Sequence, residues 1–217
     1  MTEDVPDVED VFSQSFWDER YRSSHRLWSG NPNRHLLAQA ADLPAGAALD
    51  FGCGEGADAI WLAERGWQVT GIDVSTVALQ RAAEHAAAAG PEAADRITWQ
   101  QADLRTWQPG PELFDLVTVQ YLHLPPPLRV DAYRRLAALV RPGGVFLVAA
   151  HHPSDLQTTV PRPPRPELYF TAEELAAELD PDAWLILLST AAPHVTTDPE
   201  GREVTIHDAV LKAHRLG

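Results

Sequence analysis

Apolar and polar positions alternate along most of the chain in segments that predict strands followed by helices. Seven apolar runs have the length of strands: residues 47–51, 67–73, 97–102, 114–119, 145–150, 184–188 and 203–213. Between several of them apolar residues recur at helical spacing, and Gly66 and Gly90 stand where helices would end. Strands that alternate with helices require a mostly parallel sheet with helices on both faces. The pattern therefore predicts a doubly wound α/β domain.

The carboxyl-terminal part of the chain departs from strict alternation. The last two apolar runs flank "TDPEG", which predicts a hairpin and makes the last of the seven strands antiparallel. In that strand the apolar phase slips near His207 and Asp208, which predicts a bulge. Before the hairpin, Thr171 and Glu174 have the T-x-x-E spacing of a helix capping box.

Length and composition suggest how the chain is organised. Its 217 residues suit one domain, for which we expect residues 13–217, after a solvated acidic tail at residues 1–12. Residues 13–33 are rich in aromatic and charged side chains and form an N-terminal segment that could cover a site. Residues 151–170 are rich in proline and follow the fifth strand, so we interpret them as a rim loop.

The charge and the single cysteine limit the possible partners and surroundings. A net charge of −14 argues against a nucleic-acid partner and tolerates a small cationic ligand. No apolar run approaches the roughly 20 residues that cross a bilayer, and residues 1–10 do not resemble a signal peptide. Cys53 is the only cysteine, so we expect no intrachain disulfide and a cytoplasmic location. The oligomeric state cannot be inferred from the sequence.

A glycine-rich loop follows the first strand, in the stretch "LDFGCGEG". Gly52, Gly54 and Gly56 are spaced G-x-G-x-G, whereas a dinucleotide fingerprint is G-x-G-x-x-G. Glycine at this turn lets the backbone adopt positive φ and lets a ligand approach the main chain. Asp50 lies two residues before the first glycine, where its carboxylate would repel a pyrophosphate and attract an ammonium group.

Two further carboxylates follow the next two strands. Asp73 ends the second strand and is placed to accept hydrogen bonds from both hydroxyls of a ribose, and Asp103 follows the third, where the exocyclic amine of an adenine would lie. The three carboxylates together suit a cationic, phosphate-free nucleoside, and S-adenosylmethionine meets that requirement. A nicotinamide-dependent oxidoreductase and a non-catalytic cofactor-binding protein are the alternatives to a methyltransferase.

Five motifs resemble those of the class I S-adenosylmethionine-dependent methyltransferases, in the family's order. They are "LDFGCGEG", "GIDVS", "ADL" at 102–104, "FDLVTVQYLHL" at 114–124 and "RPGG" at 141–144, where the last resembles the turn before the fifth strand. The resemblance covers about residues 34–217 and implies a Rossmann-like fold. "FWDERYRSSHRLWSGNPN" is similar to the N-terminal segment of small-molecule branches, including tellurite-resistance and thiopurine methyltransferases, where it folds over the cofactor.

The resemblance also implies which residues contact the cofactor, whose product would be S-adenosylhomocysteine. It assigns the methionine part to Asp50, Gly52, Gly54, Gly56 and Gln120, the ribose to Asp73, and the adenine to Val74, Asp103 and Leu104.

The aromatic residues of the N-terminal segment have two interpretations. Trp17, Tyr21 and Trp28 either pack a helix onto the domain or cover the cofactor, with Trp17 and Tyr21 then facing the substrate. Arg20 has the fork geometry for the cofactor's carboxylate, and a solvated surface position is its alternative. Tyr121, beside Gln120, contacts either the substrate or the core.

Two histidines follow the fourth and fifth strands. His123 and His151 could act as a base or orient a substrate, and no ligand spacing around them predicts a metal site. Methyl transfer from a sulfonium expels a neutral thioether, so it needs no acid, and the acceptor decides whether a base is needed. We expect a small-molecule acceptor, whose identity cannot be inferred from the sequence.

Overall fold

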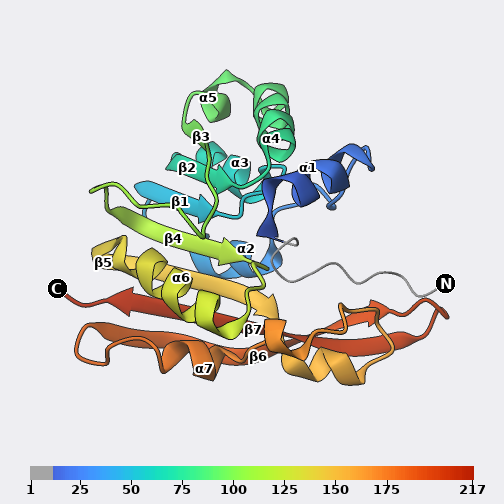
Figure 1. Ribbon diagram of the computed structural model, residues 1–217. Helices are drawn as coiled ribbons and strands as arrows, with labels where there is room; N and C mark the ends of the chain where they lie inside the picture. The colour runs from blue at the N-terminus through green and yellow to red at the C-terminus, as the bar shows by residue number, and fades with distance from the viewer. Residues whose placement is uncertain (1–11) are drawn as a thin grey trace. The chain divides into compact units, whose positions relative to one another are not determined.

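The computed structural model describes residues 12–217 (Figure 1). The predicted acidic tail at residues 1–12 therefore lies, apart from Phe12, outside the described residues. The described chain forms two compact units. The first contains residues 12–34 and 44–110, and the second contains residues 35–43 and 111–217. A single domain over residues 13–217 stays a prediction, and each unit is described by itself.

The strands form a seven-stranded sheet in the order β3-β2-β1-β4-β5-β7-β6. They are β1 (Ala47–Phe51), β2 (Gln68–Asp73), β3 (Ile97–Gln101), β4 (Phe114–Gln120), β5 (Val140–His151), β6 (Trp184–Thr197) and β7 (Glu203–Arg215). In the first unit, β1 and β3 each pair in parallel with β2. In the second unit, β4 pairs in parallel with β5, and β7 is antiparallel to both of its neighbours, β5 and β6. The predicted α/β sheet, mostly parallel with an antiparallel last strand, is confirmed.

Helices connect most of these strands. They are α1 (Gln14–Arg22), α2 (Arg34–Ala40), α3 (Ala57–Glu64), α4 (Thr76–Ala89), α5 (Pro91–Ala94), α6 (Pro126–Ala138) and α7 (Ala172–Ala176), with short 3-10 turns η2 (Pro153–Gln157) and η3 (Pro166–Leu168) in the proline-rich loop.

In the first unit, parallel pairing brings the carboxyl ends of β1, β2 and β3 to one edge. Asp50 pairs with Gly71, and Asp73 pairs with Gln101. Helix α4 begins directly after this edge because the Ser75 hydroxyl accepts a hydrogen bond from the Ala78 amide at 3.1 Å. The carboxylates predicted for one site therefore come from neighbouring strand ends.

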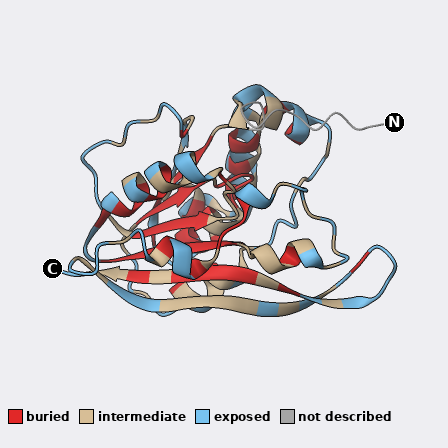
Figure 2. Ribbon diagram, turned by 60° about the horizontal axis from the view of Figure 1, so that its bottom comes forward, coloured by how far each residue is buried: buried red, intermediate tan, exposed pale blue. Residues whose placement is uncertain are grey.

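The second unit is organised around β5, whose segment 145–150 is buried throughout (Figure 2). It lies between β4, which is parallel to it, and β7, which is antiparallel. The capping box at Thr171 and Glu174 is confirmed, since each side chain accepts a hydrogen bond from the other residue's backbone amide.

Two local predictions are wrong. Residues 141–144 do not form a turn before the fifth strand but lie within β5, where Gly143 has φ +82° and the register with β4 shifts between Phe114 and Leu116. No bulge occurs at residues 207–208, where β7 pairs with β6 without interruption. The register shift lies instead in β6, between Ile186 and Leu188. The apparent phase slip has another cause, which is that β7 buries a polar side chain, Asp208.

Candidate functional site

The glycine loop of the first unit has the backbone conformation that its sequence predicts. Gly52, Gly54 and Gly56 have φ values of +79°, +53° and +85°, a region that residues with a Cβ rarely adopt. Packing adds to this restriction at Gly56, where a Cβ would lie 2.7 Å from Cη2 of Trp99 and 2.9 Å from Cβ of Ala82. Glycine therefore adopts the path of this loop with the least strain.

Asp73 ties this loop to the end of β2. Its Oδ2 accepts the Gly54 amide at 2.9 Å, and its Oδ1 accepts the Ser75 amide at 2.9 Å. Burial raises the pKa of the Asp73 carboxyl, and the backbone hydrogen bonds counteract that rise. Each carboxylate oxygen can accept more than one hydrogen bond, so Asp73 can still receive hydroxyl donors from a ligand.

Asp50 is a buried carboxylate that lacks a cationic partner among the described residues. It is 1% exposed, and its Oδ2 has no hydrogen-bond partner within residues 12–217. Burial, followed by the neighbouring Asp58 and Asp73 carboxylates, raises its pKa well above the usual range. Burial also raises the pKa of Asp58 to about 6. A ligand cation would stabilise this cluster, whereas a phosphate would be repelled.

The N-terminal segment lies directly against the glycine loop. A Cβ on Gly54 would lie 3.0 Å from the Tyr21 hydroxyl and 3.4 Å from the indole nitrogen of Trp28. That indole N–H donates to the Tyr21 hydroxyl oxygen at 2.9 Å, and the two rings lie beside Trp17. These contacts place Tyr21 and Trp28 over the loop, whereas Arg20 is exposed and stacks 5.7 Å above the Trp17 ring.

Sequence reasoning missed three side chains that hold the segment in place, which are Glu55, Arg81 and Asp18. Glu55 accepts the amides of Leu27 and Trp28 through Oε2 and pairs with Arg81 through Oε1 at 3.0 Å. Asp18 accepts hydrogen bonds from the Ser75 hydroxyl and the Val77 amide at the start of α4. Glu55 stands inside the glycine motif, but nothing in the sequence indicates its partners 26 to 28 residues away.

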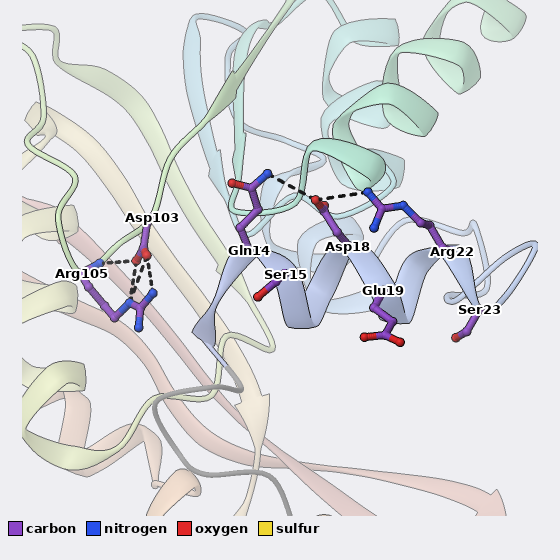
Figure 3. Close-up of a pocket in the computed structure, with 8 residues that line it drawn as sticks. All are labelled: Gln14, Ser15, Asp18, Glu19, Arg22, Ser23, Asp103 and Arg105. Atoms are coloured by element: carbon purple, nitrogen blue, oxygen red, sulfur yellow. Dashed lines mark hydrogen bonds and ion pairs between the residues drawn. The ribbon is translucent and has the colours of Figure 1, made fainter.

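A pocket of about 930 Å³ lies beside the segment in the same unit (Figure 3). Its lining consists of Gln14, Ser15, Asp18, Glu19, Arg22 and Ser23 with Asp103 and Arg105. Of the predicted cofactor residues, Asp103 is the one in this lining. Arg105 clamps its carboxylate, with Nη2 at 2.6 Å from Oδ2, and these hydrogen bonds lower the pKa of Asp103. The carboxylate predicted to accept the adenine amine is thus already held by Arg105. Of the other two residues predicted at the adenine, Val74 is half-buried and Leu104 is buried.

In the second unit, Gln120 and Tyr121 end β4. The Gln120 amide donates to the Thr118 hydroxyl at 2.7 Å, and its Oε1 is buried without a hydrogen-bond partner among the described residues. Tyr121 has φ +55°, a strained conformation for a residue with a large side chain. Its ring lies 4.7 Å from that of His151.

His123 and His151 stack on each other with ring centroids 5.0 Å apart. The His123 Nδ1–H donates to the Leu168 carbonyl at 3.2 Å, which leaves Nε2 as a buried acceptor with no partner in residues 12–217. Burial lowers the pKa of His123 to about 4, so the ring is neutral at pH 7. This makes His123 a hydrogen-bond acceptor and a poor base. No group of three or more His, Cys, Asp or Glu among the described residues could hold a metal ion.

Sequence reasoning also missed a buried carboxylate surrounded by imidazoles. Asp208 has 0% exposure and lies 2.8 Å from Nε2 of His35, 3.4 Å from Nδ1 of His194 and 3.6 Å from Nδ1 of His151. The four residues come from α2, β5, β6 and β7. Their separation along the chain, up to 173 residues, explains why no local motif indicates the cluster.

Comparison with known proteins shows what part of this chain is similar to. The sequence family described as "Methyltransferase domain" matches residues 48–144, which include the glycine loop and the strands β2, β3 and β4 that follow it. Residues 48–144 are therefore similar to a methyltransferase domain. The predicted resemblance to S-adenosylmethionine-dependent methyltransferases is confirmed at this level.

Curated relatives and solved structures extend the similarity. Thiocyanate methyltransferase 1 of Brassica oleracea is 33% identical over 144 residues, 64% of this chain and 62% of the relative. A ubiquinone biosynthesis O-methyltransferase of Serratia proteamaculans is 33% identical over 142 residues, 62% of this chain and 55% of the relative. The match thus spans less than two thirds of these relatives. The glycopeptide N-methyltransferase MtfA, solved as a complex with (S)-adenosyl-L-methionine, has the same fold, with a TM-score of 0.64, 17% identity and coverage of 86% and 88%.

No helix among the described residues is both long enough and apolar enough to cross a membrane.

Proposed function

We propose that this methyltransferase domain uses S-adenosylmethionine to methylate a small-molecule acceptor. The observation that carries the proposal is the buried Asp50 carboxylate, whose Oδ2 has no partner among the described residues and which lies close to Asp58 and Asp73. A cationic ligand at this loop would relieve that repulsion. S-adenosylmethionine is cationic at its sulfonium and its ammonium group and contains no phosphate.

The donor set of the first unit fits the parts of this cofactor. The ammonium group would be held by Asp50 and the ribose hydroxyls by Asp73, because both carboxylates can accept further hydrogen bonds. Gly52, Gly54 and Gly56 all have positive φ, and the loop they form lets a ligand approach the main chain. Tyr21 and Trp28 would exclude water from the loop.

The adenine contacts are less direct than the family resemblance implies. The Asp103 carboxylate is held by Arg105, so an adenine amine would share it with the guanidinium. Leu104 and Val74 would supply apolar contacts to the ring. Gln120, in the second unit, stays a prediction for the methionine part.

Catalysis would rest mainly on positioning. The bound cofactor supplies an electrophilic methyl group whose leaving group is neutral. The chain's own residues would hold that group and the acceptor in line and keep water away, which is where most of the rate acceleration of such a displacement arises.

The acceptor class is supported by the relatives. One of them is named for thiocyanate and another for an O-methylation in ubiquinone biosynthesis, so small acceptors of different chemistry occur among proteins similar to this chain. The net charge of −14 favours a small acceptor over a nucleic acid. A cytoplasmic location stays a prediction from the single cysteine.

Transfer of label from S-adenosyl-[methyl-³H]methionine to a panel of small phenols, amines, thiols and inorganic anions tests this function. We expect labelled product with at least one class and a large loss in Asp50→Asn, which keeps the shape of the side chain but removes its charge. Cofactor binding without transfer to any class would indicate a non-catalytic binding protein instead.

A further inference from the structure

The Tyr21 hydroxyl is a buried group in the first unit whose own proton has no acceptor within the protein. Tyr21 is 2% exposed, and its oxygen accepts the indole N–H of Trp28 at 2.9 Å. An indole nitrogen only donates, so the hydroxyl proton cannot be directed at Trp28. Among residues 12–217 no acceptor for this proton lies within hydrogen-bond distance. The hydroxyl is therefore a buried donor that a bound ligand can use.

The hydroxyl lies where a ligand would approach the glycine loop. A Cβ on Gly54 would lie 3.0 Å from the hydroxyl oxygen, so this oxygen is directly over the Gly54 main chain. Burial, followed by the nearby Asp73 carboxylate, raises the pKa of Tyr21. The hydroxyl thus stays protonated at neutral pH and remains a donor.

Two side chains of the same unit hold Tyr21 in this position. The Arg81 guanidinium donates to the Tyr21 carbonyl at 2.8 Å and to the Glu55 carboxylate at 3.0 Å. Glu55 also accepts the Trp28 amide at 3.3 Å, so Tyr21 and Trp28 are both bound to this ion pair. Because the two rings are held together, the hydroxyl is oriented before a ligand binds, which lowers the entropy that binding costs.

The parts of S-adenosylmethionine differ in whether they need a donor from the protein. Its sulfonium and ammonium groups are cationic, and its ribose hydroxyls can donate to Asp73, so these parts need acceptors. Its carboxylate is anionic and needs donors. The glycine loop offers few, because four of its main-chain amides are already hydrogen-bonded within the protein, those of Gly52, Cys53, Gly54 and Gly56.

We propose that the Tyr21 hydroxyl donates a hydrogen bond to the carboxylate of the cofactor's methionine part, and so favours nucleosides that carry this carboxylate over nucleosides that lack it. This rests on the proposed function. It assigns Tyr21 to the cofactor, whereas the sequence predicts a contact with the substrate. Asp50 and Tyr21 then hold the two charged groups of one amino acid, with the ammonium at Asp50 and the carboxylate at Tyr21.

Calorimetry with two nucleosides separates this contact from the rest of the site. S-adenosylhomocysteine carries both charged groups, whereas its decarboxylated analogue, S-adenosyl-3-thiopropylamine, carries the ammonium alone. Tyr21→Phe removes the hydroxyl and keeps the ring. It should weaken binding of S-adenosylhomocysteine on the order of 10-fold or more and change binding of the analogue by less than about 2-fold. Asp50→Asn should weaken binding of both nucleosides.

Tyr133→Phe is the matched control. It removes the hydroxyl of another buried tyrosine, which donates to the Leu122 carbonyl at 3.0 Å in the second unit, and it should leave both affinities at their wild-type values. Equal losses with the two nucleosides in Tyr21→Phe, or no loss with either, would overturn the assignment while the proposed function stands. If the wild-type protein binds neither nucleoside, the proposed function and this inference both fail.

A second measurement does not depend on whether Tyr21→Phe folds. Carbon-13 NMR of the wild-type protein, labelled at tyrosine Cζ, follows the four tyrosines of the chain. Tyr121→Phe, Tyr133→Phe and Tyr169→Phe assign the Tyr21 signal by elimination. We expect this signal to shift when S-adenosylhomocysteine is added and to shift less with the analogue, because only the former provides the charged acceptor. The same shift with both nucleosides would contradict the hydrogen bond.

Discussion

The two units bury acidic side chains in opposite ways. In the first unit Asp50, Asp58 and Asp73 lie near one another, and no ion pair within the described residues involves any of them. In the second unit Asp155 pairs with Arg162, and Asp208 is surrounded by three histidines. A buried negative charge without a cation is costly. The first unit therefore has the electrostatics of a site for a cationic ligand, whereas the second unit supplies Arg162 to Asp155 and imidazole partners to Asp208.

The largest expected effect tests how strictly the first unit fixes its loop. Gly56→Ala should destabilise the protein by about 3–5 kcal/mol, because the new Cβ would collide with Trp99 and Ala82 in addition to straining a backbone with φ +85°. Urea unfolding measures this change. Gly66→Ala is the matched control, since Gly66 has φ +89° but its Cβ would meet its nearest neighbour, Ala45, at 3.7 Å.

Gly66→Ala should therefore cost only the backbone strain, about 1–2 kcal/mol. Equal losses in the two variants would mean that packing under the loop does not restrict it.

The next largest expected effect tests whether Asp73 is the carboxylate that binds the ribose. Asp73→Ala should weaken S-adenosylhomocysteine binding by on the order of 1–3 kcal/mol, because it removes an acceptor for the ribose and releases the Gly54 amide. Titration calorimetry measures the affinity. Asp155→Asn, in the second unit, should leave it unchanged, and a comparable loss there would show that the effect is one of general stability.

The pH dependence of stability tests whether the Asp58 carboxylate is buried without a cation to balance its charge. The pKa of Asp58 is raised by burial to about 6 in the folded protein, so the folded state holds this proton more tightly than the unfolded chain. Its contribution to stability is present below pH 4 and is lost as pH rises through about 6. We expect the free energy of unfolding to fall by about 1–2 kcal/mol across this range through Asp58.

Asp58→Asn should flatten this part of the profile, as measured by urea unfolding at closely spaced pH values. A variant profile that parallels that of the wild type would remove Asp58 as the cause.

The smallest effect concerns Asp103. Because Arg105 already holds its partly exposed carboxylate, Asp103→Asn should weaken S-adenosylhomocysteine binding by less than about 1 kcal/mol. A loss as large as that of Asp73→Ala would mean that Arg105 moves aside for the adenine, and calorimetry on the two variants distinguishes these cases.

Local sequence patterns predicted what depends on short stretches of chain. The strand ends at Asp50 and Asp73 and the positive φ of the three glycines follow from nearest neighbours and turn chemistry. The capping box at Thr171 follows for the same reason. The mostly parallel sheet follows from the alternation of strands and helices, and the antiparallel last strand follows from the hairpin around "TDPEG".

Long-range contacts could not be predicted in this way. Glu55 and Asp18 bind residues 26 to 59 positions away, and Asp208 meets histidines of three other elements. The clamp of Arg105 on Asp103 is local but depends on side-chain conformation, which sequence pattern does not specify. The bulge predicted at residues 207–208 was wrong for a related reason. Asp208 is a polar residue that is buried in β7, so the sequence gives the impression that the alternation of apolar and polar positions shifts there.

We expect the first unit to bind a cationic nucleoside without phosphate. Calorimetric titration of the wild-type protein with S-adenosylhomocysteine and, separately, with NAD tests it most directly. We expect S-adenosylhomocysteine to bind to the wild-type protein and not to Asp50→Asn, and we expect no measurable heat with NAD. Tight binding of NAD, or binding of S-adenosylhomocysteine that does not depend on the Asp50 charge, would contradict it.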